Sequence, residues 1–323
     1  MTGQIIFKHI TPLFNFVQGD SEFAHSGNVN DTEYKIYIMK MSANAENFEE
    51  IIKFADPSIK NSLQSIHVSS TYLTTNYFLI TEVFLPNIAK YKSSENTIEC
   101  IQIYSTIIKA LQLSTTSGIR IDKTYTYRYP FIQDLGSLGI NGQNINDNPF
   151  KHNTEEISQF NYEHYSSCIN VFNNLLDLES SNSQFSKIIN LSLNYFTTTF
   201  KMQFTEHSFL ILMSIFEAIF KIDYKDKTEN AKKRIAKLLS SSEEEYIKIV
   251  DEFGSPTSNG YIGLRNKIVH GDISLNQEIL RDSFDQLYFR MRIAIIKIIT
   301  EGGCLKDVDD FYGKFIEKFG LTN

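Results

Sequence analysis

Cysteine is scarce in this chain, and its sequence shows no pattern that we would expect of a leader or a membrane-spanning run. The three cysteines among 323 residues, Cys100, Cys168 and Cys304, are odd in number and far apart. This pattern excludes a disulfide framework and a clustered zinc site. The N-terminus has no basic leader before an apolar core, and the longest apolar run, near residues 209–220, is too short to span a bilayer. We therefore expect a soluble, cytoplasmic protein.

Patterns that bind nucleotides or metals are also missing. The glycine-rich stretch at residues 136–142 lacks the lysine and the strand-to-helix context of a phosphate-binding loop. Six of the seven histidines show no metal-ligand spacing with cysteines or paired carboxylates. We expect neither a metal nor another cofactor. The net charge of -7 also argues against a protein that coats nucleic acid, although a local basic patch can still bind it.

The pattern of residues 1–150 predicts an α+β domain. With 42% hydrophobic and 13% aromatic residues, the chain can form ordinary packed cores, and its length suits two domains. Short segments rich in β-branched and aromatic residues predict strands at 33–41, 65–70, 72–85 and 123–129. One helix is predicted from a cap at Asn96 to a stop at Gly118. The dense turn-forming residues at 134–150 indicate the domain boundary.

Residues 151–323 predict an all-α domain. Apolar residues recur there at helical spacing, and strand-like alternation is missing. The predicted helices span about residues 154–178, 185–200, 205–222, 229–240, 242–252, 261–270, 276–300 and 305–319.

The stretch from Arg265 to Gly271 holds the residue types that metal-free RNA cleavage needs. Arg265, Asn266 and His270 place a fixed cation, an amide and an imidazole within about two helical turns. A histidine, with a reference pKa of about 6.5, can exchange a proton at neutral pH, and an arginine can bind phosphate through two N–H donors. On an ideal helix Asn266 and His270 are nearly aligned, whereas Arg265 points about 140° away from His270. Gly271 can end the helix with a left-handed turn.

An apolar helix upstream of this motif carries one embedded carboxylate, Glu217. The only other polar residue at 209–220 is Ser214, so Glu217 is expected to lose much of its water. A buried carboxylate needs a cationic partner to stay charged, and we expect Arg265 to be that partner. Two compatible interpretations stay open: a structural pair that fixes helix packing, and a carboxylate that orients a catalytic arginine.

A basic helix between these two segments supplies candidate RNA contacts. Residues 221–237 hold seven Lys or Arg and three Asp or Glu, which leaves a local excess of four positive charges. The alternative is an ordinary solvated helix face. Together with Lys267 of the motif, the candidate RNA-binding residues are Lys232, Lys233, Arg234 and Lys237.

The segments at residues 216–220, 230–239 and 261–271 resemble HEPN domains in their order and spacing, and among these the Apea-like branch. The resemblance covers roughly residues 185–300. It implies an all-helical domain that dimerises, so that two Arg-x4-His motifs share one RNA-cleaving cleft. It makes His270 and Arg265 the catalytic residues. Asn266 then matches the polar residue after the arginine, and Glu217 matches the acidic residue of the core helix.

The reaction that the resemblance implies is independent of metals. A base removes the proton from a ribose 2′-hydroxyl, which attacks the adjacent phosphate and leaves a 2′,3′-cyclic phosphate. Arg265 would stabilise the phosphoryl charge, and His270 would transfer a proton. By analogy with the family we expect an RNA endonuclease of a bacterial defence or toxin type, acting as a homodimer, with a trigger or regulator acting on residues 1–150. Two alternatives stay open: a non-catalytic HEPN module that binds RNA, nucleotide or a protein partner, and a structural dimerisation domain.

Overall fold

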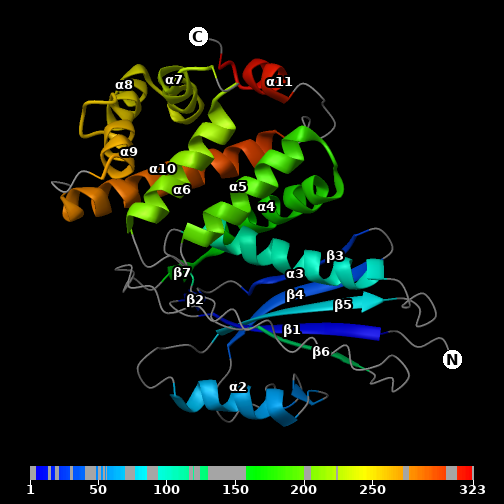
Figure 1. Cartoon of the computed structure of the whole chain (residues 1–323). Helices are drawn as coiled ribbons and strands as arrows, with labels where there is room; N and C mark the ends of the chain where they lie inside the picture. The colour runs from blue at the N-terminus through cyan, green and yellow to red at the C-terminus, as the bar shows by residue number, and fades with distance from the viewer. Residues whose placement is uncertain are drawn as a thin grey trace. The chain divides into compact units, whose positions relative to one another are not determined.

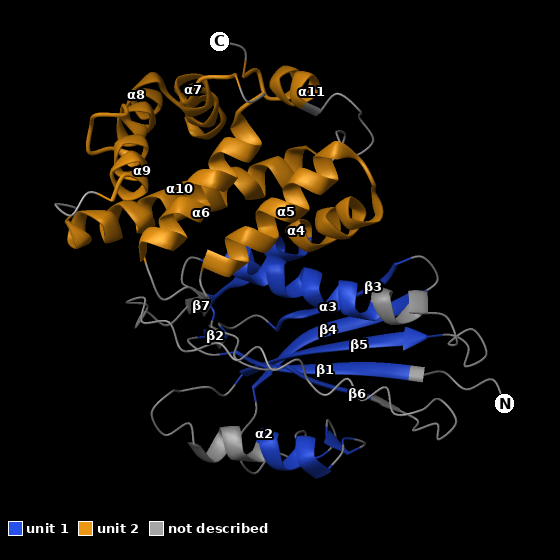
Figure 2. Ribbon diagram, viewed as in Figure 1, with its two compact units in different colours: residues 1–169 blue, residues 170–323 orange. Residues whose placement is uncertain are grey.

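Four strands open the described part of the chain, further strands and two helices follow up to residue 160, and the described residues beyond it form helices but no strand (Figure 1). The structure, a computed structural model, describes residues 5–13, 16–18, 22–29, 32–40, 49, 52–53, 55, 57–69, 77–85, 94–115, 119, 124–129, 158–199, 205–222, 225–271, 276–302 and 311–321. The chain divides into two compact units, unit 1 (residues 1–169) and unit 2 (residues 170–323) (Figure 2). The predicted boundary at 134–150 lies outside the described residues.

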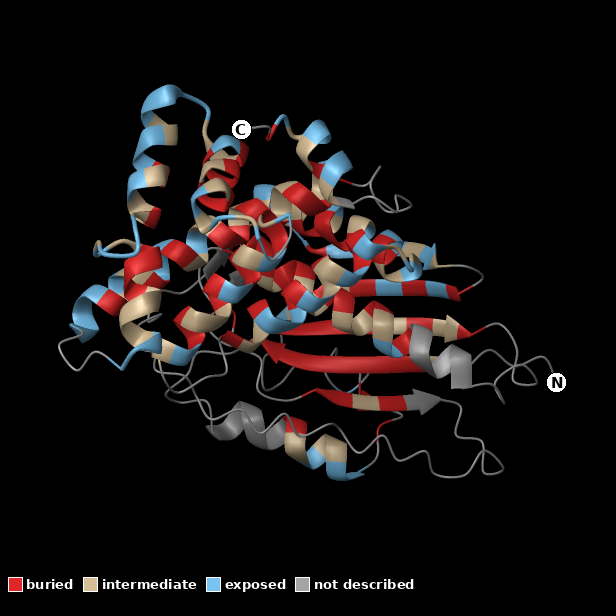
Figure 3. Ribbon diagram, turned by 45° about the horizontal axis from the view of Figure 1, so that its top comes forward, coloured by how far each residue is buried: buried red, intermediate tan, exposed pale blue. Residues whose placement is uncertain are grey.

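Unit 1 is built on a five-stranded antiparallel sheet with the strand order β3-β4-β5-β1-β6. The strands are β1 (Ile5–Leu13), β3 (Ala24–Val29), β4 (Thr32–Lys40), β5 (Tyr77–Leu85) and β6 (Tyr125–Tyr129). Burial alternates along β4, whereas nearly every residue of β5 is buried (Figure 3). The strands predicted at residues 33–41, 72–85 and 123–129 are confirmed over Thr32–Lys40, Tyr77–Leu85 and Tyr125–Tyr129, and residues 41, 72–76 and 123 lie outside the described residues.

Helices α2 (Pro57–Ser69) and α3 (Ser94–Ser114) cover opposite faces of this sheet (Figure 1). Successive residues of a strand point to opposite faces, so β1 contributes to two different interiors. Ile10 joins Leu63 of α2 in an apolar cluster. His9 instead stacks on Tyr104 of α3, with ring centroids 4.7 Å apart. The helix predicted at 96–118 is confirmed, but it begins earlier, at Ser94, and ends earlier, at Ser114.

The strand predicted at residues 65–70 is wrong, because residues 65–69 end helix α2, and residue 70 lies outside the described residues. The β-branched residues Ile66 and Val68 suggested a strand when read alone. A helix starting at Pro57 brings Ile59 and Leu63 to one face, four residues apart, and both pack against the apolar cluster under the sheet. Burial of that face outweighs the weak local preference of the last residues.

The start of the helix predicted at 154–178 is also wrong. Residues Ser158–Phe160 form strand β7, which pairs in parallel with β2 (Phe16–Gln18). The side chain of Asn161 then accepts a hydrogen bond from the His164 amide at 3.0 Å, and helix α4 (Tyr162–Ser180) follows. This is the N-cap geometry that Asn favours. Phe160 packs at ring-centroid distances of 5.5 and 5.6 Å against Phe16 and Phe23, which explains the extended backbone.

The regular secondary structure in the described residues of unit 2 is helical, as the sequence predicted. Helix α6 lies centrally and packs against α5, α7, α9 and α10 (Figure 1). Its phenylalanines, and those of neighbouring helices, form much of the fully buried interior. After α4, the helices are α5 (Gln184–Thr199), α6 (Thr205–Phe220), α7 (Thr228–Leu239), α8 (Glu243–Phe253), α9 (Tyr261–Val269), α10 (Gln277–Glu301) and α11 (Phe311–Lys318).

None of the helices in the described part of the chain is long and apolar enough to cross a bilayer.

Candidate functional site

The candidate site is built on α9, a short helix with one buried and one accessible side. Gly260 stands at its N-cap position, and Tyr261 and Leu264 are buried. At the other end His270 donates its amide to the Asn266 carbonyl at 3.0 Å, and Gly271 donates to Ile268 at 3.1 Å. Gly271 has a φ of 68°, the left-handed conformation expected from the sequence.

Arg265 forms an ion pair with Glu217 of α6, as expected. An Arg265 Nη2 to Glu217 Oε2 distance of 3.6 Å joins the two helices. The other carboxylate oxygen lies 3.4 Å from the hydroxyl of Thr228, at the start of α7. The Glu217 side chain is 23% exposed and that of Arg265 is 37% exposed. The carboxylate is therefore only partly withdrawn from water, and the Arg265 side chain keeps part of its surface accessible.

His270 is exposed at the end of α9, together with Val269 and Gly271. It is five residues from Arg265, so the two side chains leave the helix about 140° apart. Neither is buried in the helix core. Helix α9 directs the Arg265 and His270 side chains to different sides. A site that used both residues of the same helix would require the Arg265 side chain to reach around the helix.

Two of the predicted RNA-binding residues on α7 are buried instead. Lys232 is 7% exposed, donates to the Gly254 carbonyl at 2.9 Å and pairs with Glu229 at 2.8 Å. Arg234 is 3% exposed, pairs with Asp226 and donates to the Phe220 carbonyl at 2.8 Å. Both side chains are therefore occupied by partners inside the fold.

The other two candidates on α7 are more accessible. Lys233 is partly exposed and Lys237 is exposed. Lys237 borders an open hollow whose lining includes Ser242, Glu243 and Tyr246. Helix α8 begins there with consecutive acidic residues, Glu243 to Glu245. These carboxylates oppose the positive charge of Lys237, so this hollow has no clear preference for an RNA backbone.

The sequence interpretation missed the loop of residues 254–260, which leads into α9. Asn266 donates to its Pro256 carbonyl at 3.4 Å, and Lys267 donates to the Asn259 side chain at 2.7 Å. The loop is rich in Ser, Gly and Pro, which indicates a turn, but no motif in it signals a contact with α9. Thr228 was missed for the same reason, since its contact with Glu217 comes from tertiary packing.

Comparison of this chain with protein-family models, curated proteins and solved structures gave no match.

Proposed function

We propose that unit 2 is a metal-independent RNA endonuclease domain of the HEPN type. The observation that carries this proposal is the Arg265–Glu217 pair, in which an arginine of the Arg-x4-His motif is held by a carboxylate and still has 37% of its side chain exposed. A cation held in this way is preorganised for a phosphate, because its orientation does not have to be selected when the ligand binds.

In the proposed reaction Arg265 binds the scissile phosphate and stabilises the charge that develops on its oxygens. The second N–H edge of a guanidinium can bind phosphate while the first contacts a carboxylate. Glu217 is the positioning residue for this arginine, and Thr228 holds the other oxygen of the same carboxylate at 3.4 Å.

His270 transfers the proton between the ribose 2′-hydroxyl and the leaving 5′-oxygen in this scheme. Its exposure at the end of α9 leaves the ring accessible to a substrate. Because Arg265 and His270 diverge by about 140° on one helix, a second copy of the motif is proposed to complete the site. The protein would then act as a homodimer, in agreement with what the family resemblance implies.

The cellular role is proposed from the same resemblance. An RNase of this type would serve bacterial defence or act as a toxin, with unit 1 receiving a trigger or restraining the nuclease.

The test is cleavage of a mixed tRNA and messenger RNA pool by the full chain in excess EDTA. Wild type should leave 2′,3′-cyclic phosphate ends. His270→Ala should lose at least about 100-fold in cleavage rate, the usual range for general acid–base catalysis. Arg265→Ala should lower the cleavage rate by a similar factor, because removing one hydrogen-bond donor to the transition state typically has an effect of that size. His207→Ala is the matched control, since His207 is exposed on α6 and outside the proposed site.

Activity that survives in both variants would overturn the catalytic assignment. If wild type binds RNA but cleaves none, even with lysate from infected cells added as a source of trigger, the non-catalytic binding module is the correct class.

A further inference from the structure

Helix α9 is held between α6 on one side and the loop of residues 254–260 on the other. Gly263, Asn266 and Lys267 lie at positions i, i+3 and i+4 and share one face of the helix. All three meet the loop. Arg265 leaves α9 about 160° away from Gly263, toward Glu217 of α6. The loop therefore supports α9 from the side opposite the Arg265–Glu217 pair.

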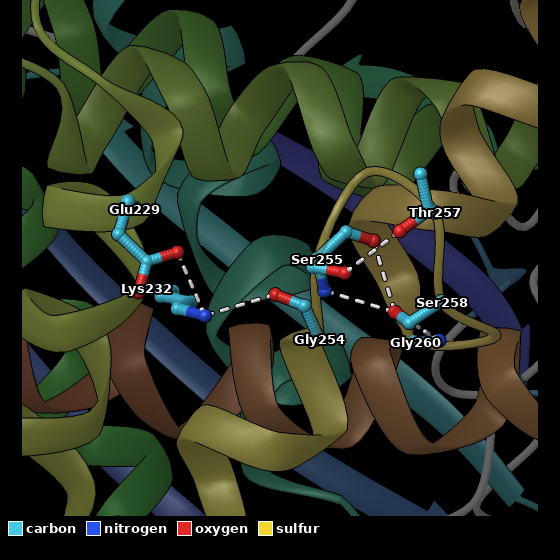
Figure 4. A network of polar contacts seen from close by, with 7 residues as sticks. All are labelled: Glu229, Lys232, Gly254, Ser255, Thr257, Ser258 and Gly260. Atoms are coloured by element: carbon cyan, nitrogen blue, oxygen red, sulfur yellow. Dashed lines mark hydrogen bonds and ion pairs between the residues drawn. The ribbon is translucent and has the colours of Figure 1, made fainter.

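The loop is closed on itself by the hydroxyl of Ser258, as Figure 4 shows. This oxygen accepts hydrogen bonds from the Ser255 amide at 2.8 Å and the Gly260 amide at 3.1 Å. It donates to the Ser255 carbonyl at 2.9 Å. One side chain thus satisfies three backbone groups, which gives the loop a defined shape.

The contact between loop and helix requires glycine at position 263. A Cβ at Gly263 would lie 1.9 Å from the Ser258 carbonyl oxygen and 3.0 Å from the Ser255 carbonyl oxygen. The loop backbone therefore rests directly on the backbone of α9. Any larger residue at 263 would have to push the loop away from the helix.

The start of the loop is anchored to α7. Lys232, buried beside Glu229, donates to the carbonyl of Gly254 at 2.9 Å (Figure 4). Gly254 has a φ of 65°, and a Cβ there would meet Ser258 Oγ at 2.2 Å and Gly260 Cα at 3.0 Å. The buried lysine thus fixes the point at which the chain leaves α8 and turns toward α9.

The side chains that tie the loop to α9 come from the motif itself. The Lys267 amine lies 2.7 Å from Asn259 Oδ1, and the Asn266 amide lies 3.4 Å from the Pro256 carbonyl. From the sequence, Lys267 was expected to bind RNA and Asn266 to belong to the catalytic set. In the structure both are turned to the loop.

We infer that Lys267 and Asn266 are positioning residues, which act through Asn259 and Pro256 of the loop to fix α9 and thereby Arg265. This inference rests on the proposed function for its effect on catalysis. The hydrogen bonds between α9 and the loop are a property of the folded chain, and they can be tested without measuring RNA cleavage.

The experiment is a double-mutant cycle between Asn259→Ala and Lys267→Met. Each single variant should lower kcat for RNA by about tenfold to 100-fold, the cost expected for small misplacements of catalytic groups. KM should stay unchanged, and the double variant should be no worse than either single one, because both remove the same contact. Asn259→Asp, which keeps an oxygen acceptor for Lys267, should retain activity. Lys248→Met on the exposed surface of α8 is the control for loss of a lysine charge.

A direct RNA contact by Lys267 predicts the opposite result. Lys267→Met would then raise KM and reduce the dependence of log KM on log salt by about 0.7 to 1, while Asn259→Ala would have no effect. Asn259→Asp would weaken RNA binding through its negative charge. Any of these three findings overturns the inference.

Hydrogen exchange separates this inference from the proposed function. Asn259→Ala and Lys267→Met should both accelerate exchange of the Ser255 and Gly260 amides, which the Ser258 hydroxyl protects. If exchange is faster in both variants but the wild-type protein cleaves no RNA, the contact between the loop and α9 exists and the nuclease proposal fails. Unchanged exchange in both variants would refute the inferred support of α9 by the loop, whether or not RNA is cleaved.

Discussion

Two arginines on helices that pack against α6 have opposite environments. Arg234 of α7 is almost fully buried and is held by Asp226 and the Phe220 carbonyl. Arg265 of α9 meets Glu217 at 3.6 Å and keeps 37% of its side chain exposed. Both belong to basic stretches that resembled RNA contacts in the sequence. The two arginines carry the same charge, and they differ in their burial and in the number of groups that hold them.

The carboxylate partners support this contrast. Burial raises the pKa of Asp226, but hydrogen bonds from Arg234, from the Ile222 amide and from Asn230 outweigh it, so that the pKa lies below its usual value. Asp226 therefore stays charged and fully bonded. Among the described residues, Glu217 has two long polar side-chain contacts, at 3.4 and 3.6 Å. The Arg265–Glu217 pair is therefore more accessible than the buried Arg234–Asp226 pair.

The largest expected effect comes from breaking the buried pair. Arg234→Met should lower the free energy of unfolding by about 3–5 kcal/mol, because it leaves Asp226 charged and without its main partner. Urea denaturation followed by circular dichroism measures this. Combining it with Asp226→Leu should recover part of the loss, since the stranded charge is then removed. A loss below about 1 kcal/mol, the range for surface pairs, would remove the distinction between the two arginines.

A pH-dependent decrease in the free energy of unfolding, of nearly the same size, is expected from a buried histidine in unit 1. Burial lowers the pKa of His9 to about 4, from 6.5 in the unfolded chain. Above pH 6.5 the ring is neutral in both states and has no effect. Between pH 6.5 and 4 only the unfolded chain binds the proton, so the free energy of unfolding falls by about 1.4 kcal/mol per pH unit. The total approaches about 3 kcal/mol near pH 4.

Urea denaturation of wild type and His9→Gln at pH 7.5 and pH 5 isolates this effect. The variant lacks the titrating ring and should lose less stability over that interval. His207→Gln, an exposed histidine outside unit 1, is the control and should follow wild type. Parallel behaviour of wild type and His9→Gln would show that burial does not lower the pKa of His9, because the ring would then bind protons equally in the folded and unfolded chain.

A smaller effect is expected at the end of α9. Gly271→Ala should cost about 1–2 kcal/mol, because an alanine adopts a φ of 68° only with strain. Nothing lies within 4 Å of a Cβ at Gly271, so the cost is conformational. Gly320 has a φ of 61° and equally open surroundings, which makes Gly320→Ala a matched control. Both should lower the melting temperature similarly, but only Gly271→Ala should also reduce RNA cleavage, because it shifts His270.

The smallest effect on stability is expected at Arg265. Arg265→Met should change the free energy of unfolding by less than about 1 kcal/mol, as for a partly exposed pair. The same substitution at Arg234 provides the comparison, in the same urea experiment. A loss at Arg265 as large as that at Arg234 would assign the Glu217 pair to packing rather than to the site.

The local parts of the site could be predicted from the sequence. A lone carboxylate in an apolar helix needs a cation, which pointed to Arg265 as the partner of Glu217. Gly271 after His270 predicted the left-handed end of α9. The strand at β7 and the helical state of residues 65–69 could not be predicted, because packing of Phe160 and of Leu63 decided the backbone there.

The sequence by itself determined the order of an α+β region followed by helices, since hydrophobic periodicity is a local property. It also determined which residues could serve as cation, carboxylate and imidazole. Tertiary structure alone decided that Lys232 and Arg234 are buried, that Arg265 is accessible, and that Lys267 faces Asn259. Burial and partner choice depend on segments far apart along the chain, and no local pattern specifies which of them will meet.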